Sequence, residues 1–550
     1  MSDARQRRLG DRAVDRVLRL PPPTTRYAVR RGVKIPMRDG VELVADHFAP
    51  LTDRAAPTIL LRNPYGRGLV SSMLHGRLYA ARGYHVIVQS VRGTFGSGGT
   101  FRPIVQEPDD GADTVAWLRE QPWFDGRLAT IGMSYSGAAQ WALMRDPPPE
   151  LAAAVIVVGP HDFYGWAWGT GAFALSDILS WSHLVAHQEE VTGWRRLLQL
   201  RRANRALEAS YAGLPLGEAG RELLSAAAPW YESWVEHPDR DDPFWASTCF
   251  DAALDKAEVP ILLIGGWQDG FINQNVHQYR RLRERGVDVA LTVGPWAHGQ
   301  MLSRAGGVVS RETLQWLDTH VAGRPGTRAG VRISVTGAKR WVDLPDWPPP
   351  TTEQVWYLQR GGGLAETSPQ PTELTSEFEY KPWSPTPAIG GPTLSLAPGH
   401  RDDSALADRD DVLAFTSAPF PDEVYVVGNP VVELRHSSDN PHVDLFVRVS
   451  EVAANGRSRS VSDGYRRLAG TAGPSLVRVE LDPVAHRFAA GSRIRVLVAG
   501  GAHPRFSRNP GTGEPPISAR SLVAARHVVH HGERSRLLLP IWRIDGGTTS

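Results

Sequence analysis

At 550 residues, the chain is too long for one hydrophobic core, and its length predicts two to four domains. Its composition, 41% hydrophobic and 22% charged, is that of an ordinary globular protein. Because 61 basic residues nearly balance 59 acidic ones, the net charge of +2 favours neither a nucleic acid nor a membrane surface as partner.

The N-terminal segment and the cysteine content bear on location. The single cysteine, Cys249, excludes an internal disulfide, and without a Cys/His cluster a structural zinc site is not expected. No apolar run is long enough to span a bilayer, and the first 20 residues lack the apolar stretch of a secretory signal, so a cytoplasmic location is expected.

The arginines between Arg5 and Arg19 fit a short amphipathic helix, but the prolines at 21–23 favour a solvated or frayed arm over residues 1–26.

Residues 27–161 alternate between strand and helix patterns. Residues 27–49 predict a β-hairpin with an Asp39-Gly40 turn. Further on, residues 107–120 have helical periodicity, with Asp109 and Asp110 suited to a helix start. Short apolar strands are predicted at 57–61, 85–89, 127–131 and 152–158. Continuous apolar strands separated by helices predict a mostly parallel sheet covered on both faces.

The rest of the chain divides into three parts. Residues 162–249 show helical stretches and aromatic clusters without a continuous apolar strand, which predicts a helical cap over the active edge of the sheet; the alternative is a helical domain unrelated to the site. Strands at 259–264 and 289–293 resume the sheet, so the α/β domain comprises 27–161 and 250–345. After a proline-rich linker, short alternating segments over 351–550 predict an all-β sandwich.

The stretch Gly132-Met-Ser-Tyr-Ser-Gly137 carries the main chemical signal. It joins a predicted strand to a predicted helix, as a nucleophile elbow does. Such a turn would expose the Ser134 hydroxyl and direct the N–H of Tyr135 toward an oxyanion. Ser136 stands where the strict motif has glycine, and the alternative is a Gly/Ser-rich turn without chemistry.

An acid and a base follow in the order that an α/β hydrolase requires. Asp269 comes just after the strand 259–264, and His298 just after the strand 289–293. His298 would take the Ser134 proton, Asp269 would orient the imidazole, and the reaction would be acyl transfer through an acyl-Ser134 ester. Alternatively, Asp269 is a turn residue and His298 an ordinary loop histidine. The rival bases are His161, His277 and His320.

Tyr65 is the candidate for a second oxyanion donor. It follows the strand 57–61, in the loop from which α/β hydrolases supply this donor. Its hydroxyl would complement the N–H of Tyr135. The alternative is a tyrosine packed over a turn.

Several motifs together resemble the CocE/NonD acyl hydrolases, the group of cocaine esterase, which is related to α-amino-acid ester hydrolases, glutaryl-cephalosporin acylases and X-Pro dipeptidyl-peptidases. The motifs are RNPYGR, VRGTFGSGG, EPDDGADTVAWLREQPWFDGRLATIGMSYSG, GGWQDGF, GPWAHG, FTSAPFPDEVYVVGNPVVELRHSSDNPHVDLFVRVSEV and PRFSRNPGTG. The resemblance spans residues 30–545. It implies an α/β-hydrolase domain, a helical cap and a C-terminal jelly roll. It also implies a Ser134–Asp269–His298 triad and an oxyanion hole formed by the Tyr65 hydroxyl and the Tyr135 N–H.

The chain departs from the family pattern in two places. Ser90 replaces the aspartate common before Val-Arg-Gly, and glycine stands at 98 and 99 where an acidic residue is common, so an ion pair of Arg92 is expected to be rearranged. The neighbours of Asp269 are Gln268 and Gly270, so the acidic cluster that binds a substrate ammonium in amino-acid ester hydrolases is missing. Substrates with an α-amino group are therefore less expected.

The predicted substrate is a small-molecule ester or amide, with no cofactor and no metal. An acyl pocket is expected between Ser134 and the cap, where aromatic residues would favour apolar or aromatic acyl groups, although such residues more often form a core. The candidates are Phe163, Trp166, Trp168, Phe173 and Trp267. X-Pro dipeptidyl-peptidase or β-lactam acylase activity is the alternative within the class; a carbohydrate-binding or adhesion module and an inactive scaffold are the alternatives outside it. A homodimer is left open.

Overall fold

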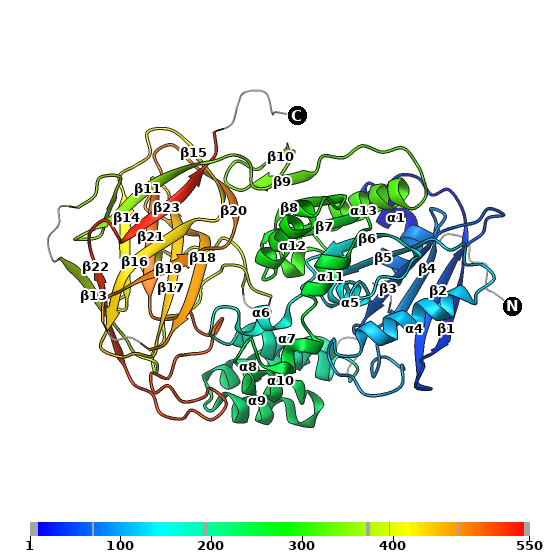
Figure 1. The fold of residues 1–550 in the computed structure, drawn as a ribbon, viewed down its shortest axis with the longest axis horizontal. Helices are drawn as coiled ribbons and strands as arrows, with labels where there is room; N and C mark the ends of the chain where they lie inside the picture. Colours follow the sequence, from blue (N-terminus) through cyan, green and yellow to red (C-terminus); the bar gives the residue numbers. More distant parts are fainter. Residues whose placement is uncertain are drawn as a thin grey trace. The chain divides into compact units, whose positions relative to one another are not determined.

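The computed structural model describes residues 9–68, 71–190, 195–369, 374–394, 397–470 and 473–543 (Figure 1). The chain forms two compact units. The first comprises residues 1–163, 243–266 and 274–330, and the second comprises residues 164–242, 267–273 and 331–550. The predicted domain boundaries stay predictions.

The first unit is built on a sheet whose strands run in the order β1-β2-β4-β3-β5-β6-β7-β8 (Figure 1). The strands are β1 (Tyr27–Pro36), β2 (Glu42–Pro50), β3 (Thr58–Asn63), β4 (His85–Ser90), β5 (Leu128–Met133), β6 (Leu151–Val157), β7 (Ile261–Gln268) and β8 (Val289–Ala297). Parallel pairing from β4 through β3, β5 and β6 to β7 confirms the predicted mostly parallel sheet. The hairpin β1–β2 is antiparallel, and β2 pairs antiparallel with β4.

Burial explains why these strands form a parallel core. Every residue of β3, β4 and β7 is buried, because both faces of a parallel sheet are covered. In contrast, β1 at the edge is partly exposed and alternates between buried and exposed positions from Val33 to Pro36. Its turn to β2 contains Gly40 at φ +82°, a left-handed conformation that glycine adopts without strain.

Helices of the first unit pack on this sheet and on one another. They are α1 (Leu9–Leu18), η1 (Ser72–Arg77), α3 (Leu78–Ala80), α4 (Glu107–Arg119), α5 (Tyr135–Leu143), η3 (Pro243–Ser247), α11 (Asp251–Lys256), α12 (Ile272–Glu284), η4 (His298–Gln300) and α13 (Gly306–His320). Helix α1 packs on α13, and Arg311 Nη1 donates to the Leu18 carbonyl at 2.6 Å. Residues 9–18 are therefore a docked helix rather than a frayed arm, while Arg5 and Arg8 lie outside the described residues.

The helical insertion between β6 and β7 is confirmed. Its helices are α6 (Phe163–Trp168), α7 (Leu175–His187), α8 (Arg195–Ala212), α9 (Leu216–Leu224), η2 (Ser225–Ala227) and α10 (Trp230–Glu236). Aromatic side chains hold it together: the rings of Trp181 and Trp234 stack at 6.0 Å, and Trp168 Nε1 donates to the Trp234 carbonyl at 2.8 Å. The aromatic clusters of the sequence are thus largely the core of this insertion.

The C-terminal part is the predicted all-β sandwich, with a core of alternating inward residues such as Leu434, Val447 and Val496. Its strands are β11 (Thr352–Gln359), β12 (Gly363–Ala365), β13 (Thr375–Tyr380), β14 (Val412–Ser417), β15 (Val424–Gly428), β16 (Val431–Ser438), β17 (Val443–Val452), β18 (Ser458–Leu468), β19 (Ser475–Glu480), β20 (Val484–Phe488), β21 (Arg493–Ala499), β22 (Ala525–His530) and β23 (Arg536–Ile541), with η5 (Ser404–Leu406). An antiparallel hairpin of β9 (Val331–Val335) and β10 (Arg340–Leu344), which the sequence did not predict, precedes them. The predicted fold class is confirmed.

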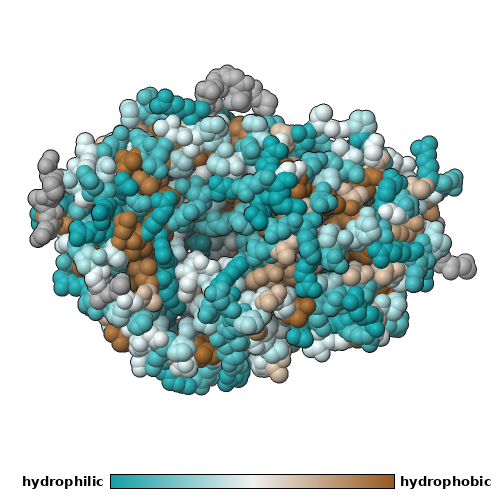
Figure 2. All heavy atoms as spheres, viewed as in Figure 1, coloured by the Kyte–Doolittle hydropathy of each residue, from teal (hydrophilic) through white to brown (hydrophobic). Residues whose placement is uncertain are grey.

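The visible surface is mainly hydrophilic. In Figure 2, hydrophobic residues gather in separate groups among polar ones. Among the described residues, no helix has both the length and the apolarity needed to cross a bilayer.

A buried ion pair lies inside the sandwich. Arg448 on β17 binds Asp463 on β18 through two hydrogen bonds of 2.7 and 2.9 Å, and both side chains are at most 2% exposed. Arg505 Nη1 donates to the same carboxylate at 2.8 Å. Burial opposes ionisation of Asp463, but the charges of Arg448 and Arg505 outweigh it and lower the pKa of the carboxyl.

Removing one partner of this pair should destabilise the protein strongly. Arg448→Met leaves a buried carboxylate short of its main partner, which costs about 3–5 kcal/mol. The matched control is Arg457→Met, which removes a pair with Asp402 whose side chains are 60% and 43% exposed and should destabilise the protein far less, because an exposed ion pair contributes little to stability. Urea unfolding monitored by circular dichroism measures both, and equal losses would contradict the expectation.

Candidate active site

Ser134 occupies a strained turn between β5 and α5. Its φ of +58° and ψ of −122° lie in a region that non-glycine residues rarely adopt, and such strain is found at nucleophile elbows. The backbone of the turn is fixed by its ends. The Ser134 N–H donates to the Val157 carbonyl at 2.9 Å, and the Ser134 carbonyl accepts from Gly137 N at 2.8 Å.

Close backbone packing explains the small residues around Ser134. A Cβ on Gly137 would lie 2.6 Å from Gly159 Cα, and a Cβ on Gly132 would lie 2.4 Å from Ser136 Cβ and 2.6 Å from the Ser136 carbonyl oxygen. Ser136 is accommodated because Gly132, which faces it, has no side chain. The serine in the usual glycine position therefore leaves the elbow intact.

The Ser134 hydroxyl is in contact with His298. Ser134 Oγ and His298 Nε2 are 3.0 Å apart, the distance of a hydrogen bond between a nucleophile and its general base. His298 begins η4, directly after β8, so the sheet carries the histidine to the same edge as the elbow.

Asp269 follows β7, the strand beside β8. Its side chain is fully buried, and one carboxylate oxygen accepts the Phe271 N–H at 2.8 Å. This bond holds the turn after β7 in shape. The roles of Asp269 and His298 as triad members stay predictions.

The rival histidines are engaged in other contacts. The rings of His161 and His277 stack at 5.5 Å, and His161 Nε2 lies 3.6 Å from Asp251. His320 lies against the Trp316 ring and has its Nδ1 3.7 Å from Asp288.

His161, Asp251 and His277 are also the one group of three potential metal ligands among the described residues, with ligand atoms within 4.8 Å of one another. The tautomer of His161 argues against that use. Gln278 Nε2 donates to the Gly159 carbonyl at 2.8 Å and so presents its other hydrogen to His161 Nδ1 at 3.0 Å. The proton of the neutral ring is then on Nε2, the atom that faces Asp251, and a cation would have to displace it.

The two tyrosines predicted to form the oxyanion hole differ in environment. Tyr65 is 38% exposed, and its N–H donates to Asn63 Oδ1 at 2.8 Å. Tyr135 is buried, with its hydroxyl 2.9 Å from a carboxylate oxygen of Glu107. Its backbone N–H lies in the first turn of α5, where backbone donors point out of the helix end.

A comparison with known proteins decides the family. Cocaine esterase of Rhodococcus sp. (strain MB1 Bresler) is 30% identical over 575 residues, which cover 94% of this chain and 99% of that protein. The chain belongs to the cocaine esterase family. It is accordingly a serine hydrolase.

Family models and solved structures agree with this assignment. A family model described as X-Pro dipeptidyl-peptidase (S15 family) matches residues 39–300, and one for the X-Pro dipeptidyl-peptidase C-terminal non-catalytic domain matches residues 324–539. The solved structure of an aminopeptidase from the marine sediment archaeon Thaumarchaeota archaeon aligns with a TM-score of 0.81 and 26% identity over 94% of this chain and 96% of that one. An α-amino acid ester hydrolase shares the fold, with a TM-score of 0.78 and 23% identity over 94% and 97% of the two chains.

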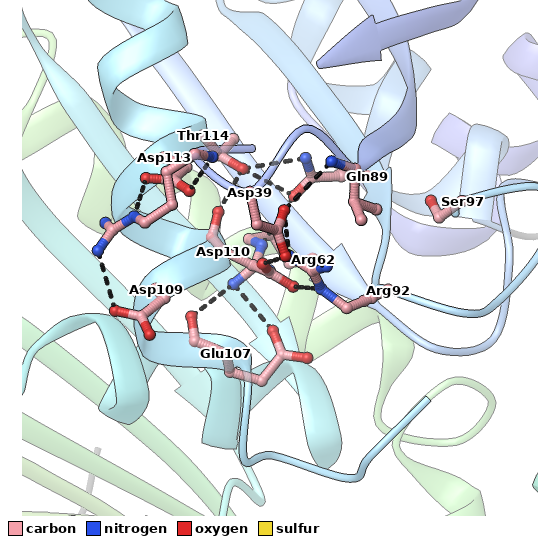
Figure 3. Close-up of polar contacts among 12 residues, drawn as sticks. Asp39, Arg62, Gln89, Arg92, Ser97, Glu107, Asp109, Asp110, Asp113 and Thr114 are labelled. Atoms are coloured by element: carbon pink, nitrogen blue, oxygen red, sulfur yellow. Dashed lines mark hydrogen bonds and ion pairs between the residues drawn. The ribbon is translucent and has the colours of Figure 1, made fainter. Parts of the chain in front are cut away.

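The departures from the pattern of the cocaine esterase family have a structural explanation. Arg92 pairs with Asp110 at 2.6 Å and with Asp39 of the β1–β2 turn at 2.7 Å (Figure 3). The side chain of Arg92 covers Gly99, where a Cβ would lie 2.9 Å from Arg92 Cγ. Ser90 accepts a hydrogen bond from Arg67 instead. The sequence did not identify Asp39 and Asp110 as partners of Arg92.

Most of the aromatic pocket candidates are deeply buried. Phe163, Trp168, Phe173 and Trp267 are each at most 2% exposed. Trp267 Nε1 donates to the Ser334 carbonyl at 2.7 Å, and the rings of Trp168 and Phe173 pack 5.1 Å apart. Trp166 is only half-buried, and its ring lies 5.6 Å from that of Phe271, two residues after Asp269. The aromatic pocket stays a prediction, for which Trp166 retains the most accessible surface.

An apolar cavity of the first unit adjoins the elbow. Met133, the residue before Ser134, contributes to its wall together with Val157 from the end of β6. Met301 and Leu302, which follow η4, complete this part of the wall. The cavity offers an apolar surface next to the end of β5, the strand that precedes Ser134.

The close packing of the elbow predicts opposite outcomes for two neighbouring substitutions. Gly137→Ala forces a methyl group against the Gly159 backbone and should displace Ser134, lowering kcat/KM for a p-nitrophenyl ester by about 100-fold. Ser136→Gly removes a side chain that Gly132 already accommodates and should keep kcat/KM within about threefold. Steady-state kinetics measures both, and full activity of the Gly137 variant would contradict the packing argument.

Proposed function

We propose that the chain hydrolyses small acyl esters or amides through a covalent acyl-Ser134 intermediate, with His298 as general base and Asp269 as its orienting acid. The observation that carries the proposal is the 3.0 Å contact between Ser134 Oγ and His298 Nε2 at a strained strand-to-helix turn.

The reaction follows from the groups at this turn. Ser134 Oγ attacks the substrate carbonyl while His298 Nε2 takes the hydroxyl proton, and the resulting oxyanion accepts hydrogen bonds from the Tyr135 N–H and the Tyr65 hydroxyl. His298 then gives the proton to the departing alcohol or amine. Water attacks the acyl-enzyme in the same way, releasing the acid and restoring Ser134.

The position of Asp269 supports its role. It follows β7 directly and His298 follows β8 directly, and these strands are neighbours in the sheet. Parallel neighbours end at the same edge, so an acid after one and a base after the other suit a triad. A buried carboxylate there would hold the imidazole tautomer that leaves Nε2 able to accept the Ser134 proton.

The substrate class rests on the relatives and on the missing acidic cluster. Cocaine esterase is named for an ester substrate, and the neighbours of Asp269 in this chain, Gln268 and Gly270, carry no charge for a substrate ammonium. We therefore favour esters with an apolar acyl group, for which the cavity lined by Met133 provides apolar surface in the first unit. X-Pro dipeptidyl-peptidase activity is the second candidate because the S15 family model matches residues 39–300.

We also infer the cellular compartment of the enzyme and its class of substrate. A single cysteine suits a reducing compartment, so we place the enzyme in the cytoplasm, acting on small molecules rather than on nucleic acids or membranes.

Replacing the nucleophile tests the proposal. Ser134→Ala should lower p-nitrophenyl ester hydrolysis by at least about 10⁴-fold, because no group remains to form the acyl-enzyme. A fluorophosphonate should label the wild type on Ser134, located by peptide mass spectrometry, and should not label the variant. Retained activity in Ser134→Ala would exclude Ser134 as nucleophile.

Measuring kcat/KM for aminoacyl-prolyl p-nitroanilides beside the esters separates the two candidate functions.

Removing the Tyr65 hydroxyl tests the oxyanion hole. Tyr65→Phe should lower kcat by about 10²–10³-fold with little change in KM, since an oxyanion donor acts mainly in the transition state. Because the side chain is 38% exposed, the substitution should leave the melting temperature nearly unchanged. An unchanged kcat would remove Tyr65 from the oxyanion hole.

A further inference from the structure

The side chain of Tyr135 is held by a buried carboxylate beneath the elbow. Its hydroxyl donates to Glu107 Oε1 at 2.9 Å and accepts the Ile104 N–H at 2.9 Å. Since the Ile104 N–H can only donate, the phenol must use its own hydrogen toward Glu107. Burial, together with the charge of Glu107, raises the pKa of the Tyr135 hydroxyl, so the phenol stays protonated and keeps this direction.

Glu107 is in turn paired with an arginine. Its second oxygen, Oε2, lies 2.8 Å from Arg62 Nη1, and the two side chains are 3% and 4% exposed (Figure 3). Arg62 makes two further hydrogen bonds. Its Nε donates to Gln89 Oε1 at 2.7 Å, and its Nη1 donates to the Glu107 carbonyl at 3.0 Å. A buried carboxylate is costly unless it is paired, so this pair has little freedom to move.

The pair joins the two segments that carry the proposed oxyanion donors. Arg62 lies near the end of β3, three residues before Tyr65, and the intervening Asn63 accepts the Tyr65 N–H at 2.8 Å. Glu107 is the first residue of α4, and Tyr135 is the first residue of α5. One buried carboxylate therefore connects β3, α4 and α5 at the ends nearest to Ser134.

The loop before α4 is strained at Ile104, and the Tyr135 hydroxyl holds it in place. Ile104, a β-branched residue, has φ +69°, a strained conformation for its type. Its N–H is bonded to the Tyr135 hydroxyl, and the Phe101 ring packs 5.9 Å from the Tyr135 ring. The phenol thus ties a strained loop to the same helix end that presents the Tyr135 N–H.

From this geometry we infer that Arg62 and Glu107 are positioning residues for the oxyanion hole: the pair fixes Tyr135 through its hydroxyl and so sets the direction of the Tyr135 N–H. The inference rests on the proposed function. It assigns a role to Arg62, Glu107 and the Tyr135 hydroxyl, none of which is among the reacting groups of the proposed mechanism.

The test compares two buried tyrosines that each donate to a carboxylate. Tyr135→Phe removes the bond to Glu107, and the control Tyr84→Phe removes a bond of 2.7 Å to Asp318 at a fully buried ring elsewhere in the first unit. A small alkyl trifluoromethyl ketone serves as the probe, because it adds to the serine as a hemiketal whose oxyanion occupies the hole. The measurements are kcat and KM for a p-nitrophenyl ester, the inhibition constant of the ketone, and the melting temperature.

Positioning predicts a pattern that loss of stability alone does not. Tyr135→Phe and Glu107→Gln should lower kcat and raise the inhibition constant of the ketone by a similar factor, about tenfold or more, with KM within about twofold. Tyr84→Phe should lower the melting temperature and leave kcat and the inhibition constant within about twofold. If Tyr135→Phe changes only the melting temperature, as Tyr84→Phe does, the inference is overturned. Should Glu107→Gln fail to fold, Tyr135→Phe decides alone, since it removes a single oxygen.

Fluorophosphonate labelling separates this result from the proposed function. If the wild type is not labelled on Ser134, the proposed function fails and the positioning role fails with it. If Ser134 is labelled in the wild type and in Tyr135→Phe but kcat and the inhibition constant do not change, only the positioning role is wrong.

Discussion

The turn at Ser134 is the constraint on which the rest of the candidate site depends. The positive φ of Ser134 is tolerated because glycines allow close packing on both sides of the turn. Gly132 packs against Ser136, and Gly137 packs against Gly159. This turn projects the Ser134 hydroxyl from the edge of the sheet. There, Ser134 Oγ lies 3.0 Å from Nε2 of His298, which directly follows β8. The strain is maintained by the parallel strands β5 and β6, whose buried pairing does not allow the turn to relax.

Buried ion pairs recur in both units, and they serve different purposes. In the sandwich, Arg448 and Asp463 join two adjacent strands far along the chain from any predicted site residue, so their effect is on stability. In the first unit, Arg62 with Glu107 and Arg92 with Asp110 attach α4 to β3 and to the loop after β4. Such pairs contribute little net stability compared with apolar packing, but they fix orientation because each carboxylate must keep its partner. That property suits residues beside a reactive turn.

The elements of the first unit were predictable wherever one local pattern dominated. Strands β3 and β4 are continuous apolar runs, and α4 begins with acidic residues that favour a helix N-terminus. Prediction was poorer where tertiary contacts decide. Helix α1 has only ten residues and would fray alone, but it docks on α13. The hairpin β9–β10 was not predicted as strands, although its residues fall within the predicted α/β range 250–345, since its short strands are stabilised by pairing that the local sequence does not reveal.

The same division holds for the candidate site. By itself, the sequence determined the family, the elbow motif and the order of Ser134, Asp269 and His298, because strand ends and motif spacing are local properties of the chain. Tertiary structure alone decided that Ser136 is harmless, since Gly132 faces it, and that the ion-pair partners of Arg92 are Asp39 and Asp110. It also decided that Tyr135 is anchored through Glu107 to Arg62. These partners are separated by 18 to 53 positions in the sequence, and only the packing of strands and helices brings their charges together.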